Sequence, residues 1–147
     1  MRDVFVHMTR FSLACIALLS IISCSGGVMI MSQNPDQSAR ETATLRNGAY
    51  VILEKCDGVD LGSRRSVVFS PGSHTIKVSF IPQFTGNKYV YSNTIASVTF
   101  EAEAGHLYVV DGNWSADRWT ADIYDKSIGE SIAHSQYLPL QADWENL

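Results

Sequence analysis

Apolar and polar residues alternate along two segments of the chain, and this pattern restricts the fold more than any other feature. The alternation runs over residues 75–80 and again over residues 95–104. Successive side chains of a β-strand point to opposite faces, so one face of each segment is apolar and the other is polar. The apolar positions are Ile76, Val78 and Phe80 in the first segment and Ala96, Val98, Phe100 and Ala102 in the second. A sheet with one dry and one wet face is typical of antiparallel strands, which the pattern therefore predicts.

Further strand-like segments follow one another from Gly48 onward. Asp57-Gly58 and Pro71-Gly72 are turn dipeptides between them, and Gly105 lies where a tight hairpin needs a positive φ. The predicted strands are 49–56, 66–70, 75–80, 95–104, 107–110, 119–124 and 130–133. The helix period of apolar residues is missing from these segments. We therefore predict an all-β fold, a small antiparallel β-sandwich of about seven strands.

The N-terminal region has the pattern of a secretory signal. Residues 11–22 form an apolar run that is too short to span a bilayer as a helix, which takes about 20 residues. Arg10 supplies the positive charge that precedes such a run. Asp3 fits that region poorly, so Met8 is an alternative start to Met1.

The apolar run ends in Ile21-Ile22-Ser23-Cys24, which resembles the lipobox of bacterial lipoproteins. This resemblance implies that the Cys24 thiolate accepts a diacylglycerol and that cleavage before Cys24 frees an amine for a further acyl chain. Two or more chains anchor a protein stably. The alternative is an ordinary secretory signal or an uncleaved anchor, with Cys24 incidental. Ser25 stands where a retention signal for the inner membrane would have Asp, so we expect a periplasm-facing lipoprotein of the outer membrane, with the inner membrane as the alternative.

We divide the chain into a signal peptide (1–23), the lipidated cysteine with a tether (24–46), the sandwich (47–134) and a C-terminal tail (135–147). The tether segment shows little periodicity, and we expect it to hold the domain some tens of Å from the lipid. The tail either packs on the sandwich or binds a partner. Cys15 leaves with the signal and Cys24 carries lipid, so Cys56 has no partner for an intramolecular disulfide, and we expect it to be a buried, small apolar residue.

Composition excludes two classes of protein. Among the 147 residues, 18% are charged and 10% are aromatic, which is too apolar for a disordered chain. The net charge of −4 argues against nucleic acid as a partner. The length accommodates one core.

Two motifs resemble families of bacterial envelope proteins. The residues 57–62 (DGVDLG) and 70–78 (SPGSHTIKV) are similar to the PEGA-type repeat, although Ser63-Arg64-Arg65 stands where that family usually has Thr-Pro. Residues 100–108 (FEAEAGHLY) resemble a segment of small lipoproteins with a transthyretin-like sandwich. Neither resemblance brings catalytic residues, and both imply a surface or scaffold module.

Three groups of polar residues carry weaker signals. Residues 111–117 place oxygen ligands at alternate positions, as in a calcium loop, but Ala116 stands at the position that needs glycine, so we interpret them as a hairpin loop. His74 and His106 each follow a turn, and we expect them to cap or pack against it rather than bind metal. Arg64 and Arg65 suit an anion, but adjacent residues of a strand point to opposite faces, which argues against a shared site.

The sequence thus predicts no catalytic residue, no metal site and no cofactor. Trp114 in a loop and Trp144 in the tail are candidate partner-binding residues, because exposed Trp often anchors interfaces; the alternative is that both cover the open end of the sandwich. We expect a lipid-anchored, non-catalytic binding or scaffold module, attached to the membrane through Cys24, with an envelope protein or a glycan as partner. The alternatives are a metal-binding or enzyme-accessory module and a purely structural lipoprotein.

Overall fold

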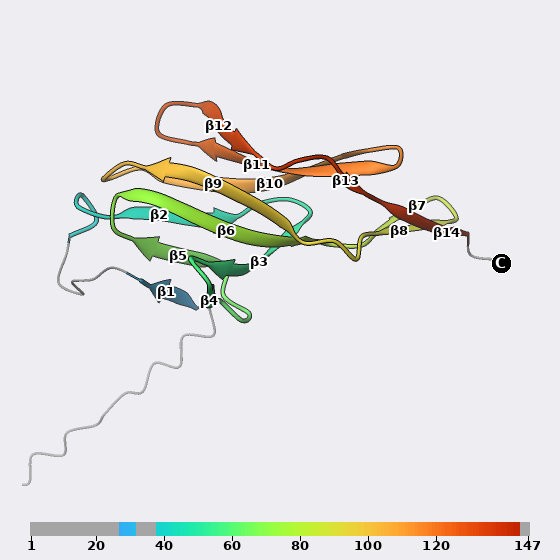
Figure 1. The fold of residues 1–147 in the computed structure, drawn as a ribbon, viewed down its shortest axis with the longest axis horizontal. Coiled ribbons are helices and arrows are strands. Elements are labelled where there is room, and N and C mark those ends of the chain that lie inside the picture. Colours follow the sequence, from blue (N-terminus) through green and yellow to red (C-terminus); the bar gives the residue numbers. More distant parts are fainter. Residues whose placement is uncertain (1–26, 32–37, 145–147) are drawn as a thin grey trace, which may run out of the picture.

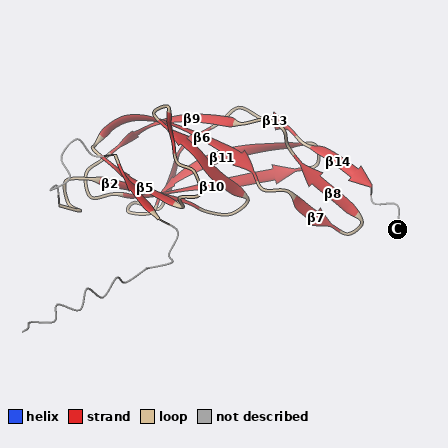
Figure 2. Ribbon diagram, turned by 90° about the horizontal axis from the view of Figure 1, so that it is seen from below, coloured by secondary structure: helices blue, strands red, loops and turns tan. Residues whose placement is uncertain are grey.

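The computed structural model describes residues 27–31 and 38–144, which form β-strands joined by turns and loops. Two facing sheets make a small sandwich, as the alternation predicts, and a third, smaller sheet extends from one end of it (Figures 1 and 2). No helix capable of spanning a membrane lies within these ranges.

The larger sheet has the order β1-β5-β2-β10-β11-β12, with β13 also paired to β11. Its strands are β1 (Val28–Ile30), β2 (Ala43–Asn47), β5 (Ser66–Phe69), β10 (Leu107–Ser115), β11 (Arg118–Asp125), β12 (Glu130–His134) and β13 (Leu138–Pro139). Most pairs are antiparallel, but β1 runs parallel to β5 and β2 runs parallel to β10. The prediction of antiparallel strands is therefore correct for most strand pairs and wrong for these two.

The second sheet has the order β4-β3-β6-β9, and the small sheet has the order β14-β8-β7. Their strands are β3 (Val51–Cys56), β4 (Val59–Asp60), β6 (Gly72–Phe80), β7 (Gln83–Thr85), β8 (Lys88–Tyr91), β9 (Ala96–Ala102) and β14 (Gln141–Trp144). Figure 1 shows β7, β8 and β14 as an arm beyond the end of the sandwich.

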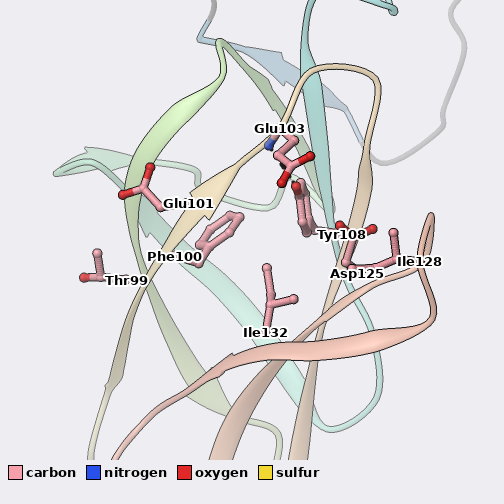
Figure 3. Close-up of a pocket in the computed structure, with 8 residues that line it drawn as sticks. All are labelled: Thr99, Phe100, Glu101, Glu103, Tyr108, Asp125, Ile128 and Ile132. Carbon is pink, nitrogen blue, oxygen red and sulfur yellow. Dashed lines mark hydrogen bonds between the residues drawn. The ribbon is translucent and has the colours of Figure 1, made fainter.

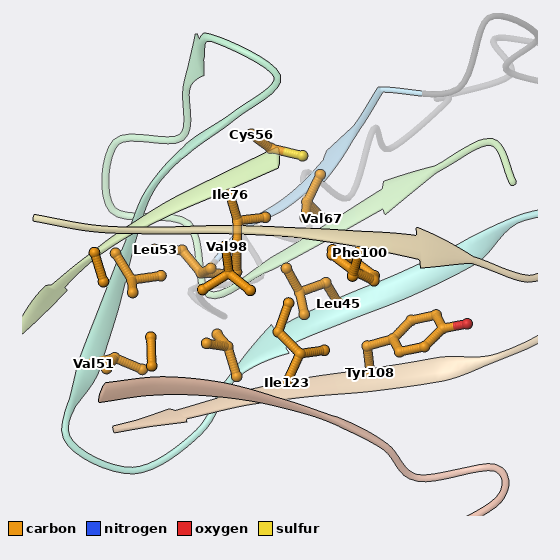
Figure 4. Close-up of a cluster of buried hydrophobic side chains, with 14 of the residues drawn as sticks. Leu45, Val51, Leu53, Cys56, Val67, Ile76, Val98, Phe100, Tyr108 and Ile123 are labelled. Atoms are coloured by element: carbon orange, nitrogen blue, oxygen red, sulfur yellow. The ribbon is translucent and has the colours of Figure 1, made fainter. Parts of the chain in front are cut away.

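The core lies between the two large sheets and takes the residues that the alternation predicts. Along β9 burial alternates strictly, with Ala96, Val98, Phe100 and Ala102 buried and the residues between them exposed. The largest buried side chains include Trp119 and Tyr108. Figure 4 shows Tyr108 in a cluster of buried apolar side chains that come from both sheets. Cys56 is a free, fully buried thiol within this core, as expected.

Two glycines allow local geometry that a side chain would prevent. Gly105 has a φ of 80° in the turn between β9 and β10, as the hairpin motif predicts. Gly112 packs so closely on the start of β3 that a Cβ at this position would lie 2.9 Å from Cγ1 of Val51 and 3.2 Å from the carbonyl oxygen of Tyr50.

The boundaries of the sandwich differ from the expected ones. Within the segment 24–46, expected to be a tether, β1 and most of β2 belong to the larger sheet. The tail, residues 135–147, contributes β13 and β14. Residues 111–117 are not a loop, because β10 continues to Ser115 and pairs with β11 along its whole length. The alternation pattern does not predict the short edge strands, because two or three residues are too few to show a period.

Candidate functional site

An open cleft lies between β9, at the edge of the second sheet, and the hairpin formed by β11 and β12 of the larger sheet (Figure 3). Its volume is about 360 Å³. The cleft is lined by Thr99, Phe100, Glu101, Glu103, Tyr108, Asp125, Ile128 and Ile132. In the described part of the chain β9 pairs only with β6. The other edge of β9 forms no strand pair there and borders the cleft.

Apolar side chains form the floor and one wall of the cleft. Phe100 meets Tyr108 edge to face at 5.2 Å between ring centroids, and both rings are buried. Ile128 and Ile132 lie on the opposite wall and are 56% and 38% exposed. Two exposed isoleucines facing a recess offer apolar contact area to a ligand.

One of the residues that line the cleft, Asp125, forms a carboxylate–imidazole pair with His106. Asp125 is the last residue of β11 and is buried, and its Oδ2 lies 2.7 Å from Nδ1 of His106. The backbone amide of Ser127 donates to Oδ1 of Asp125 at 2.8 Å. Burial by itself raises the pKa of Asp125, but the hydrogen bonds from His106 and Ser127 outweigh it and the pKa is lowered. The hydrogen bond to Asp125 in turn raises the pKa of His106.

Glu101 and Glu103 add negative charge to the β9 side of the cleft. Both side chains are exposed, since they occupy the outward positions of the alternation. Oε2 of Glu103 lies 3.7 Å from Nε2 of His106, and the amide of Glu103 donates to the Tyr108 hydroxyl at 2.9 Å. Burial raises the pKa of Tyr108. With one imidazole against three carboxylates, the cleft has a negative balance.

The hydroxyl and imidazole groups at the cleft are already engaged with neighbouring groups. The Thr99 hydroxyl is engaged with the Thr75 hydroxyl at 2.8 Å, and no serine or cysteine is among the residues that line the cleft. The Asp125–His106 pair resembles the orienting half of a catalytic triad, but such a pair needs a nucleophile within hydrogen-bond reach of the second ring nitrogen. That nitrogen faces Glu103 instead.

A second cluster joins Cys56, Asp57 and His74, whose potential ligand atoms lie within 4.8 Å of one another. Sequence spacing does not place Cys56 and Asp57 near His74, because the β3–β6 register that brings Cys56 opposite Ile76 cannot be read from spacing. The two ring nitrogens of His74 lie 2.6 Å from Oδ2 of Asp57 and 2.7 Å from the carbonyl oxygen of Ser70. Burial, followed by the nearby Asp57 charge, raises the pKa of the Cys56 thiol to about 12. These contacts favour a structural pair that fastens the β3–β4 turn to β6.

The expected partner-binding tryptophans are placed differently. Trp114 lies on β10, not in a loop, and is half-buried between Tyr50 and Phe80 at centroid distances of 6.4 and 6.2 Å. This placement favours the alternative that Trp114 covers the end of the sandwich. Trp144 is the last residue of β14, where its backbone pairs with Lys88. The described residues do not include Cys24.

The residues considered as calcium ligands form hydrogen bonds with neighbouring parts of the sandwich. The Asp111 carboxylate accepts a hydrogen bond from the Ala49 amide at 2.7 Å, and the Asn113 amide donates to Asp122 across the β10–β11 pair. Asp111, Asn113 and Ser115 share one face of β10, but an extended strand rises about 3.3 Å per residue, so their oxygen atoms are spread along the strand and do not curl around one point as in a calcium loop.

The cleft is formed by residues that are far apart in the sequence. Glu103 and His106 are close in sequence, but Asp125 reaches them only through the β10–β11 pairing, in which Tyr108 is opposite Asp125. The comparisons with known proteins add nothing to this site, since no family model, no curated protein and no solved structure matches the chain.

Proposed function

We propose that this chain is a lipid-anchored lipoprotein of the cell envelope whose sandwich binds another envelope component without catalysing a reaction. The lipobox-like Ile21-Ile22-Ser23-Cys24 supports the anchor, with the outer membrane as the site of attachment and the domain facing the periplasm. The cleft beside β9 is the observation that carries the binding role.

The lining of the cleft indicates the chemistry of the ligand. Ile128 and Ile132 favour an apolar body, whereas Glu101 and Glu103 favour a positively charged group. A lysine or arginine side chain of a partner protein combines both properties, since its aliphatic stem is apolar and its end is cationic. We therefore propose a protein partner that presents a basic side chain.

A photo-cross-linking experiment in cells tests this binding role. A photoreactive phenylalanine analogue replaces Ile132, and the cross-linked partner is identified by mass spectrometry. We expect a discrete protein partner whose yield falls at least fivefold in the double variant Glu101→Gln, Glu103→Gln, because the cation loses its counter-charges. The matched control is Asp117→Asn, which removes a charge that is 87% exposed outside the cleft.

Two results would contradict the binding role. One is the absence of any cross-link from position 132. The other is a cross-link whose yield is the same in the double variant and in Asp117→Asn. Lipidation is tested separately by incorporation of radiolabelled palmitate, and equal labelling of the native protein and of Cys24→Ser would exclude Cys24 as the lipid site.

A further inference from the structure

Strand β1 brings the folded domain close to the proposed lipid site. Its three residues pair with β5, and the amide of Met31 donates to the carbonyl oxygen of Val68 at 2.7 Å. Met29 and Met31 pack against the core. The folded part of the chain is therefore already present at Gly27, three residues after Cys24.

Covalent geometry limits the distance between the two. Three fully extended residues span at most about 10 Å. If acyl chains on Cys24 enter a bilayer, Gly27 must lie within about that distance of the headgroup region. The domain then rests at the membrane surface instead of being held tens of Å away by a tether.

Two arginines lie at this corner of the sandwich. Because β1 and β5 are parallel, the chain before Val28 and the chain before Ser66 enter their strands from the same end. A methyl group placed on Gly27 would lie 3.8 Å from Cγ of Arg64. Arg64 and its neighbour Arg65 are both exposed, so their guanidinium groups are accessible at the point where the lipidated segment joins the domain.

Arg64 and Arg65 share one recess, contrary to the sequence-based prediction. They belong to the loop before β5, which begins at Ser66, so the alternation of a strand does not separate them. The recess has a volume of about 440 Å³ and is lined by Asn47, Ile52, Ser63, Arg64, Arg65 and Ile81. Among the described residues neither arginine forms an ion pair, and Arg64 donates only to the Leu61 carbonyl oxygen, at 3.2 Å.

We propose that Arg64 and Arg65 bind the phosphate groups of phospholipid headgroups in the bilayer that holds Cys24. This inference rests on the proposed lipidation. Guanidinium groups bind phosphate oxygens in a bidentate manner, and neither group must break an ion pair to do so. Ile52, which is 43% exposed, offers an apolar contact beside them.

The contact of the two arginines with the headgroups orients the domain on the membrane, whereas the acyl chains attach it there. Two basic residues add little to the affinity of an otherwise acidic protein for a membrane, whereas acyl chains hold it there. Once Cys24 is anchored, the headgroups are at high local concentration and a weak contact is sufficient. Because β1 and β12 are at opposite ends of the larger sheet, this orientation turns β12 and the cleft away from the bilayer (Figure 1).

The test uses a photoreactive phenylalanine analogue at position 52 in cells grown with radioactive phosphate. The acyl chains and the diacylglycerol on a lipidated cysteine contain no phosphorus, so phosphorus label on the denatured protein reports a cross-linked phospholipid and not the anchor or free phosphate. We expect label from position 52, at least a fivefold loss in Arg64→Gln, Arg65→Gln, and no loss in the matched control Arg118→Gln. The same analogue at position 132 should give no phosphorus label.

The outcomes separate this inference from the function on which it rests. Palmitate on Cys24 without phosphorus label from position 52 overturns the orientation and leaves the lipid anchor intact. Label that persists in the double arginine variant overturns the role of the two arginines. Absence of palmitate from Cys24 contradicts the proposed anchor itself.

Discussion

Two histidines of this protein each pair with an aspartate that ends or follows a strand. His74 meets Asp57 after β3, and His106 meets Asp125 at the end of β11. In both cases the aspartate also accepts a backbone hydrogen bond from the turn or strand beside it, from Thr75 or Ser127. Each histidine therefore fastens a turn from a distant part of the chain through a carboxylate, whereas the sequence predicted contact with the turn that the histidine itself follows.

Replacement of Asp57 should destabilise the fold. Asp57→Ala removes the acceptors for the Thr75 amide and for His74, and it places alanine at a φ of 48°, which favours Asn, Asp or Gly. We expect a loss of about 1–3 kcal/mol in the free energy of unfolding, measured with urea. Asp57→Asn should lose less, because asparagine tolerates this φ and its oxygen still accepts from Thr75. Asp117→Ala is the matched surface control, and an equal loss there would show that the contacts of Asp57 are not responsible.

The pairing of His106 with Asp125 predicts a pH dependence. The pKa of His106 is raised, so its contribution to stability is complete below its ordinary pKa of 6.5 and is lost as the pH rises through the folded value. The pKa of Asp125 is lowered, so its contribution is present above 3.8 and is lost as the pH falls through the folded value. In Asp125→Asn the pKa of His106 should fall, as NMR titration of the ring protons would show. An unchanged His106 titration would mean that Asp125 does not set it.

At the scale of elements, the edge strands determine which sheet edges are covered and which remain accessible. Strand β1 covers one end of the larger sheet, and β9 leaves one edge of the second sheet beside the cleft. Both features follow from pairing between segments far apart in the chain. A strand of three residues has no pattern of its own, so β1 forms because β5 offers it an edge and the core accepts Met29.

A substitution in β1 should show whether the packing of Met29 on the core holds this strand against β5. Met29→Asp places a charge where the side chain packs on the core, and we expect β1 to detach from β5. Hydrogen exchange of the Met31 amide, which donates to Val68, should then accelerate at least tenfold. Val28→Asp is the matched control on the same strand, because Val28 is 57% exposed. Equal exchange rates in both variants would argue that β1 is not held through Met29.

At the scale of the whole molecule, the C-terminal segment completes the sandwich. Ser135 is buried, its amide donates to the Ala121 carbonyl oxygen at 2.9 Å, and its hydroxyl accepts from the Ala121 amide at 3.0 Å. Leu138 and Leu140 pack against the core. The segment is therefore part of the fold, whether or not it also contacts a partner.

Truncation after His134 should consequently destabilise the protein. It exposes the core beneath Leu138 and Leu140 and leaves Ala121 without two hydrogen bonds. We expect a loss of about 2–4 kcal/mol in the free energy of unfolding, measured by denaturant titration. Tyr137→Ala, at a side chain that is 73% exposed, should change stability by less than about 1 kcal/mol. A truncated chain with native stability would show that the segment is dispensable for folding.

The sequence by itself determined the fold class and the buried faces. The period of two in residues 75–80 and 95–104 identified the inward sets of β6 and β9, and the Gly105 turn was correctly predicted. These are local properties, because side-chain direction in a strand and the φ of a glycine depend on neighbouring residues. The lipobox at Cys24 is also local and stays a prediction.

Only the tertiary structure decided which distant residues meet. The β10–β11 register placed Asp125 beside His106, the parallel β1–β5 pair placed Gly27 beside Arg64, and the length of β10 moved Trp114 from an expected loop into the packing at the end of the sandwich. Registers and edge partners are set by the competition of all strands for the same core and the same edges, and a one-residue slip would reverse every face. The cleft and the recess that contains Arg64 and Arg65 result from these pairings, so the sequence alone does not predict them.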